Sequence, residues 1–153
     1  PQRRSSAQPK PSPTLRSAQT CRVHNPFGDL CYLLAASGKY NKWTFGKIKH
    51  YFLPPVQLGQ HFIFRNGDYP IGFLSYAWVA DDMLEKLLSG EHSVQPDQWQ
   101  SGNNLFFPDM VAPFGNVQTM MRQVQQQMRE VYGPDMRGYW YRHAKKKASH
   151  AAT

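Results

Sequence analysis

Residues 60–79 carry the pattern that most restricts the fold of this chain. Gln60 to Arg65 and Ile71 to Val79 are rich in apolar and aromatic residues, and Asn66-Gly67-Asp68-Tyr69-Pro70 separates them. An Asn-Gly pair between two such runs favours a tight turn. The segment is therefore predicted to form an antiparallel hairpin with strands over 60–65 and 71–79.

Other segments are predicted to cover this hairpin. The apolar pattern indicates helices over 27–36, 43–52, 81–89 and 117–131, and further strands over 105–112 and 136–142. Asp29 lies near the start of the first helix, Pro54-Pro55 is expected to end the second, and Asn116 is expected to cap the fourth. This order predicts an α+β fold with a mainly antiparallel central sheet flanked by helices.

The chain of 153 residues fits one folded domain, with charged segments at both ends. Residues 1–22 are proline-rich and basic and are predicted to be disordered, residues 23–142 form the predicted domain, and residues 143–153 form a basic tail. The net charge of +8 comes from the ends, because residues 23–141 hold nine Lys and Arg against ten Asp and Glu. A nucleic-acid-binding domain should carry its basic residues on the folded part, so we expect no nucleic-acid partner. The ends are either solvated tails or attract an acidic partner.

The lengths of the apolar runs indicate where the protein is located, and the location predicts the state of its cysteines. There is no run of 18 apolar residues and no apolar segment behind the basic residues near the start, so we expect no stable membrane insertion, no secretory signal and a cytoplasmic location. Cys21 and Cys31 are then expected to be free thiols, with Cys31 in the core. The histidines are scattered, which predicts no metal site.

Three segments, in order, resemble one family. They are Asp68-Tyr69-Pro70-Ile71-Gly72-Phe73-Leu74-Ser75-Tyr76-Ala77, Trp99-Gln100-Ser101-Gly102-Asn103 and Phe107-Pro108-Asp109-Met110-Val111-Ala112-Pro113-Phe114-Gly115. They are similar to D-Y-P-V-A-Y-C-S-W-A, W-x-S-G-D and F-I-D-W-I-A-P-F-G of the RTX toxin-activating protein-lysine acyltransferases. Each match alone is weak, but the ordered set is specific.

The resemblance implies a fold related to the GNAT acetyltransferases and a fatty acyl transfer from acyl carrier protein to internal lysines of an RTX protoxin. No bound cofactor is expected. The sequence agrees in one respect, because it lacks the glycine-rich [RQ]-x-x-G-x-[GA] turn whose backbone N–H groups would hold a coenzyme A pyrophosphate. A homodimer is left open.

Two residues are candidates for catalysis by this resemblance. The family pairs an aspartate, matched by Asp109, with a histidine whose position is occupied here by Tyr40. Asp109 would orient or deprotonate the incoming lysine, and Tyr40 would act as an acid or a positioning group. His50 and His61 are further candidates for the missing base. The substrate-binding residues are not predicted.

Alternatives stay open at several positions. Ser75 and Tyr76 either pack in the core or line an acyl pocket, and Trp99 either anchors its loop or forms a lid. The apolar face formed by Val117, Met120, Met121, Val124 and Met128 is expected to be core. The change from histidine to Tyr40 also suggests an alternative function, namely a catalytically impaired relative that acts as a toxin-binding or chaperone-like accessory protein.

Overall fold

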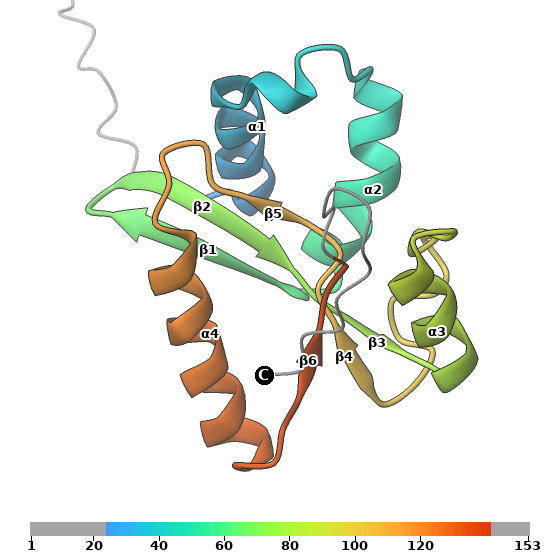
Figure 1. Cartoon of the computed structure of the whole chain (residues 1–153). Helices are drawn as coiled ribbons and strands as arrows, with labels where there is room; N and C mark the ends of the chain where they lie inside the picture. The colour runs from blue at the N-terminus through green and yellow to red at the C-terminus, as the bar shows by residue number, and fades with distance from the viewer. Residues whose placement is uncertain (1–23, 142–153) are drawn as a thin grey trace, which may run out of the picture.

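A computed structural model describes residues 24–141, which form two small sheets and four α-helices (Figure 1). Helices α1 and α2 lie against one face of the sheet β1-β2-β5, α4 lies against the opposite face, and α3 lies beside β3 and β4. The predicted α+β fold with antiparallel pairing is confirmed and is consistent with a GNAT-like fold. The predicted terminal segments 1–22 and 143–153 lie outside the described residues.

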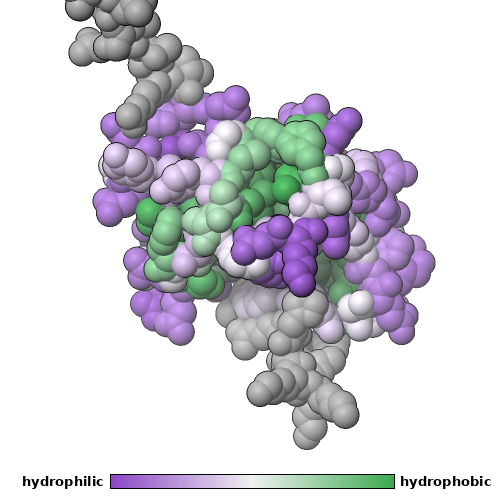
Figure 2. Space-filling view, turned by 90° about the horizontal axis from the view of Figure 1, so that it is seen from above, coloured by the Kyte–Doolittle hydropathy of each residue, from purple (hydrophilic) through white to green (hydrophobic). Residues whose placement is uncertain are grey.

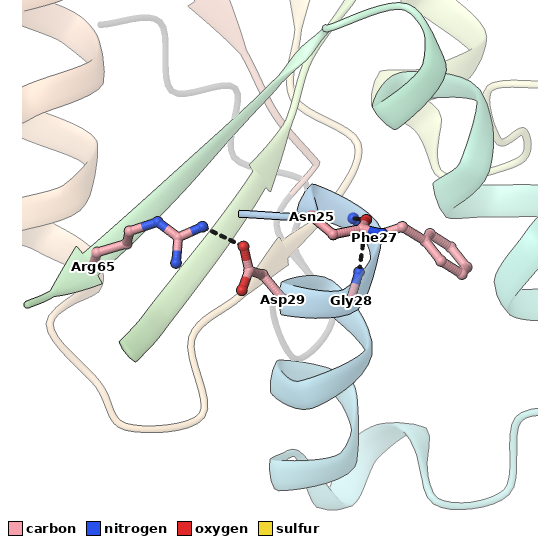
Figure 3. Close-up of polar contacts among 5 residues, drawn as sticks. All are labelled: Asn25, Phe27, Gly28, Asp29 and Arg65. Carbon is pink, nitrogen blue, oxygen red and sulfur yellow. Dashed lines mark hydrogen bonds and ion pairs between the residues drawn. The ribbon is translucent and has the colours of Figure 1, made fainter. Parts of the chain in front are cut away.

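Polar contacts cap the start of helix α1, Pro26–Ala36, and fix the helix in place (Figure 3). The Asn25 side-chain oxygen accepts hydrogen bonds from the backbone N–H groups of Phe27 at 3.0 Å and Gly28 at 3.3 Å. These bonds satisfy donors that a helix start leaves free. Asp29 in the first turn forms an ion pair with Arg65 of β1. The helix is thereby tied to the hairpin.

The predicted hairpin is confirmed. Strands β1, His61–Asn66, and β2, Tyr69–Ser75, pair antiparallel, and β2 also pairs with β5, Met110–Val111. Gly67 in the turn has φ of 59°, a left-handed conformation that costs glycine little. The register shifts by one residue between Phe64 and Arg65, because Ile71 of β2 is an extra residue opposite them, as in a β-bulge.

The predicted strand 71–79 is broken at Tyr76. Its second part, β3 (Ala77–Val79), belongs to another sheet, where it pairs antiparallel with β4 (Asn104–Phe106). The Gln60 side-chain amide donates hydrogen bonds to the carbonyls of Tyr76 at 3.0 Å and Trp99 at 2.9 Å, and so holds the two sheets at the break.

The other predicted strands are also shorter than expected. The strand over 105–112 consists of β4 and β5, separated by Phe107–Asp109, because the chain passes between the two sheets here as well. The strand over 136–142 is reduced to β6, Gly138–Tyr139, which pairs parallel to β4. Each break reflects tertiary pairing that the local pattern does not encode.

Helix α2, Phe45–Gln57, continues through Pro54-Pro55, so the prediction that these prolines end the helix is wrong. Proline removes a backbone donor but keeps its carbonyl acceptor. The Pro54 carbonyl accepts from the Leu58 N–H at 3.0 Å and the Pro55 carbonyl from the Gln60 N–H at 2.8 Å. The helix also begins later than predicted, at Phe45, because the Thr44 side chain caps it.

The last two helices lie as predicted, with one difference. Helix α3 is Asp81–Ser89 and helix α4 is Val117–Tyr132. Asn116 precedes α4 in a left-handed conformation with φ of 68°, and its side chain makes no capping hydrogen bond. The predicted cap is therefore wrong.

The core is divided by the sheets. Phe73 of β2 packs with α1 and α2, whereas its neighbour Leu74 packs with α4, because successive strand residues point to opposite faces. Met120, Val124 and Met128 of α4 are buried as predicted. Fully burying one such side chain contributes about 1.5–3 kcal/mol.

The face formed by α1 and α2 has apolar residues in a central band with hydrophilic residues around it (Figure 2). Tyr32 on α1 and Phe45 on α2 are exposed. Within residues 24–141, no helix is long and apolar enough to span a bilayer.

Candidate functional site

Asp109 lies at the point where the chain passes from β4 to β5, and its backbone is fixed by Ser75. The Ser75 N–H donates to the Asp109 carbonyl at 3.0 Å, and the Asp109 N–H donates to the Ser75 hydroxyl at 3.1 Å. Ser75 ends β2 and is fully buried. Both crossings between the sheets are thus joined at Asp109, and this places its partly buried side chain at the junction.

Burial raises the pKa of the Asp109 carboxyl to about 6, although the nearby positive charge of Lys39 acts in the opposite direction. Burial has this effect because it disfavours the charged form. A carboxyl with this pKa is mostly ionised at neutral pH, and it holds a proton more strongly than an ordinary aspartate does.

Tyr40 lies near Asp109, as the resemblance implies, but it is buried in a three-residue 3₁₀-helix, Gly38–Tyr40. Its ring packs edge-on against Trp43 at 4.9 Å and Phe52 at 5.8 Å between centroids. Burial, and secondarily the charge of Asp109, raises the pKa of the Tyr40 hydroxyl well above its ordinary value. The buried hydroxyl has no hydrogen-bond partner among residues 24–141.

Two clefts meet at Asp109, because Pro108, Asp109 and Tyr141 line both of them. The first, with a volume of about 560 Å³, is called the apolar cleft and lies between α4 and the strands. Its apolar lining includes Leu74, Phe107, Met110, Val117, Met121 and Trp140, and Gln118, Arg122 and Gln125 of α4 also line it.

The second cleft, of about 320 Å³, is called the lysine cleft. Its charged residues are Lys39, Lys47 and Asp109, and His92 and Ser93 also line it. The Lys47 Nζ atom lies 4.2 Å from the centre of the Trp43 ring, and the Lys39 Nζ atom lies 5.2 Å from the centre of the Tyr40 ring. Neither cleft is enclosed. In the described part of the chain, no three His, Cys, Asp or Glu residues are grouped to hold a metal ion.

The model of one protein family, the RTX toxin acyltransferase family, matches residues 19–151. The chain belongs to this family. The match includes the whole described structure, and therefore both clefts and Asp109.

Similar proteins of this family are known by name. The chain is 28% identical over 97 residues to the lysine-acyltransferase RtxC of Vibrio cholerae. The aligned segment covers 62% of this chain and 63% of the relative. The chain is also 29% identical over 89 residues to the protein-lysine myristoyltransferase HlyC of Escherichia coli. Here the aligned segment covers 58% of this chain and 52% of the relative.

A third relative is an uncharacterised protein of Synechocystis, 28% identical over 96 residues, with coverage of 61% of this chain and 65% of the relative. The chain therefore spans less than two thirds of the length of these curated relatives.

The histidines considered from the sequence lie outside both clefts of this family member. His61 is hydrogen bonded to the Pro55 carbonyl at 3.2 Å and stacks on Phe73. His50 is hydrogen bonded to Gln95 at 3.2 Å. His92, which the sequence reasoning did not single out, lines the lysine cleft together with Asp109.

The W-x-S-G segment of this RTX toxin acyltransferase family member has a structural role. Trp99 is buried and anchors its loop, and the N–H groups of Ser101 and Gly102 both donate to the Trp78 carbonyl. A Cβ atom on Gly102 would collide with the backbone of Val79 and Ala80. This close approach explains the glycine.

Other predicted positions have simpler roles. Ser75 and Tyr76 lie outside both clefts, so they support the site from the core. Val117 is exposed and Met121 partly exposed, and both line the apolar cleft. Cys31 is a free, partly buried thiol, whereas Cys21 lies outside the described residues.

The sequence reasoning missed Gln60, Lys39 and Lys47. The contact of Lys47 with Trp43 had no helical spacing behind it, because Trp43 precedes the Thr44 cap and lies outside α2.

Proposed function

We propose that this protein transfers a fatty acyl group from acyl carrier protein to lysine side chains of an RTX protoxin. The observation that carries the proposal is the position of Asp109, a carboxyl with a raised pKa at the meeting point of an apolar cleft and a cationic cleft. Perturbed carboxyls in clefts are typical of sites that move protons. Membership of the acyltransferase family and the names of the relatives support the same reaction.

In the proposed reaction, the lysine ammonium first loses a proton to the Asp109 carboxylate. The resulting amine attacks the thioester carbonyl, an N–C bond forms and the C–S bond breaks. The second proton on nitrogen goes to the leaving thiolate, so that an amide and a free thiol result. The proton on Asp109 is then released to solvent.

The raised pKa of Asp109 supports its role as the proton acceptor. A lysine has an ordinary pKa of about 10.4, so proton transfer to an ordinary aspartate is strongly unfavourable. A pKa of about 6 in place of 3.8 makes this transfer easier by about 3 kcal/mol.

Of the two roles considered for Tyr40, we propose the positioning role. An acid must release its proton to the leaving thiolate, whose ordinary pKa is about 8.5. The pKa of Tyr40 is raised far above this value, so the transfer would be unfavourable. Its ring instead supports Lys39 and Trp43 on the wall of the lysine cleft.

The test is mass spectrometry of an RTX protoxin that is co-expressed with the protein. Wild type is expected to leave acyl adducts on protoxin lysines, Asp109→Asn to leave none, and the exposed control Asp97→Asn to match wild type. An unmodified protoxin in the presence of folded wild type would refute catalysis and favour the accessory-protein alternative. Full activity of Asp109→Asn would refute the role of Asp109.

A further inference from the structure

The apolar cleft and the lysine cleft share Pro108, Asp109 and Tyr141 in their linings but differ in charge. The lysine cleft is lined by two cations, Lys39 and Lys47, whereas Arg122 is the one cation among the described lining residues of the larger and mainly apolar cleft. A single extended ligand that passes Asp109 would therefore have one end in mainly apolar surroundings and the other end beside two lysines. An acyl phosphopantetheine thioester has these properties, because its chain is apolar, its arm carries a phosphodiester, and the reacting carbonyl lies between them.

We propose that the two clefts divide one such donor between them: the acyl chain lies in the apolar cleft, the phosphate-bearing arm lies in the lysine cleft, and the thioester carbonyl lies beside Asp109. This inference rests on the proposed acyl transfer and assigns its donor site.

The lining of the apolar cleft supports the place of the chain. The described residues Leu74, Met110 and Met121 come from β2, β5 and α4, so the cleft is formed between elements. Each methylene fully buried there raises affinity by about fourfold. A long chain should therefore bind more tightly than a short one, in proportion to the length that the cleft buries.

Charge in the lysine cleft supports the place of the arm. Lys39 and Lys47 line it, and Asp109 is the one carboxylate among its described lining residues. The rings of Tyr40 and Trp43 lie under the two ammonium groups and hold them at this wall. A lysine of the protein substrate would meet more positive than negative charge here, whereas a phosphodiester would be attracted.

The amine has a separate approach. Neither cleft is enclosed, so a donor lying in them would stay partly accessible beside Asp109. The acceptor lysine then reaches Asp109 without displacing either end of the donor.

The experiment measures binding by calorimetry, with full-length protein and an unreactive analogue in which an amide replaces the thioester. The analogue is prepared with a short or a long acyl chain, carried either by coenzyme A or by acyl carrier protein. Lys47→Ala is expected to weaken binding about fivefold for both chain lengths, and less at high salt. Lys49→Ala is the control, because Lys49 is on the same helix and lines neither cleft.

Met121→Trp fills the apolar cleft and is expected to weaken binding of the long chain about tenfold while it leaves the short chain nearly unchanged. Val117→Trp, at an exposed position of the same cleft, is a second variant in case Met121→Trp does not fold. Val131→Trp is the control, since Val131 is exposed on α4 and outside both clefts.

Three results would overturn the proposal. The first is an equal loss of affinity for short and long acyl chains in both cleft-filling variants. The others are equal effects of Lys47→Ala and Lys49→Ala on affinity, and no binding of the analogue by wild type. Binding of both the coenzyme A form and the carrier-protein form would show that the acyl chain and the phosphate-bearing arm suffice for binding. Binding of the carrier-protein form alone would show that contacts with the carrier protein are also needed. If the analogue binds as proposed but the protoxin stays unmodified, the donor site stands and the proposed function fails.

Discussion

Replacing Asp109 by asparagine should make the protein more stable at neutral pH while it removes activity. Asparagine has nearly the same shape but no charge, so it avoids the unfavourable burial of a carboxylate. The folded protein raises the pKa of Asp109 from 3.8 to about 6 by burial. Folding is therefore linked to proton uptake at this carboxyl.

The sign and size of the effect follow from the pKa. Below about pH 3 the carboxyl is protonated in both the folded and the unfolded chain, so it adds no pH-dependent difference. As the pH rises from about 3 to about 7, the unfolded chain releases the proton first, and the wild type loses stability. Above about pH 7 the loss is complete and amounts to up to about 3 kcal/mol, since each pKa unit corresponds to about 1.4 kcal/mol.

The assay is urea unfolding of wild type and Asp109→Asn, followed by tryptophan fluorescence, at about pH 4 and about pH 7.5. The difference in unfolding free energy between the two proteins isolates Asp109, because they share the other titrating groups. It should be small at the lower pH and favour the variant at the higher pH. The surface control Asp97→Asn should differ from wild type by less than about 0.5 kcal/mol at both values.

A stability difference that stays the same at both pH values would refute this reasoning, because it would mean that folding does not raise the pKa of Asp109. A less stable Asp109→Asn variant at neutral pH would refute it as well. The predicted result would also show that any loss of acylation does not come from unfolding.

Three further substitutions test the surroundings of the site. Tyr40→Phe should stay within about 1 kcal/mol of wild type in urea unfolding and keep acylating the protoxin, because the buried hydroxyl has no hydrogen-bond partner in the described part of the chain. Lost activity at unchanged stability would assign the hydroxyl to the chemistry. Gln60→Leu should cost about 2–4 kcal/mol in the same measurement, since two carbonyls, those of Tyr76 and Trp99, lose their donor; a neutral effect would contradict the role of the amide. Gly102→Ala should cost about 1–3 kcal/mol through its backbone collision, and an unchanged thermal midpoint would contradict it.

The hairpin and the helices could be predicted because their patterns are local. Asn66-Gly67 fixes the turn, and the spacing of apolar residues marks α1, α3 and α4. The breaks at Tyr76 and at Phe107–Asp109 could not be predicted, because both segments keep the composition of a strand. Only the pairing of β3 with β4 and of β2 with β5 decides where each strand ends.

The site was predicted in part for the same reason. Asp109 and Tyr40 came from the resemblance, and the structure brings them near each other. The clefts need residues from α2, the loop after α3, α4 and the segment near Tyr141, which are far apart in the sequence. Their meeting at Asp109 is a property of the folded chain.

The bulge between Phe64 and Arg65 has a consequence for the behaviour of the protein in concentrated solution. Among the described strands, β1 is at the edge of its sheet and pairs with β2 on one side. A straight edge strand invites pairing with a strand of another molecule, which leads to aggregation. Here the extra residue of the bulge, Ile71, lies on β2, and the bulge twists the β1-β2 pair away from a straight edge. The charged Arg65 of β1 lies beside this twist and is held by Asp29. Folded molecules should therefore resist association along β1, and any self-association should use another surface.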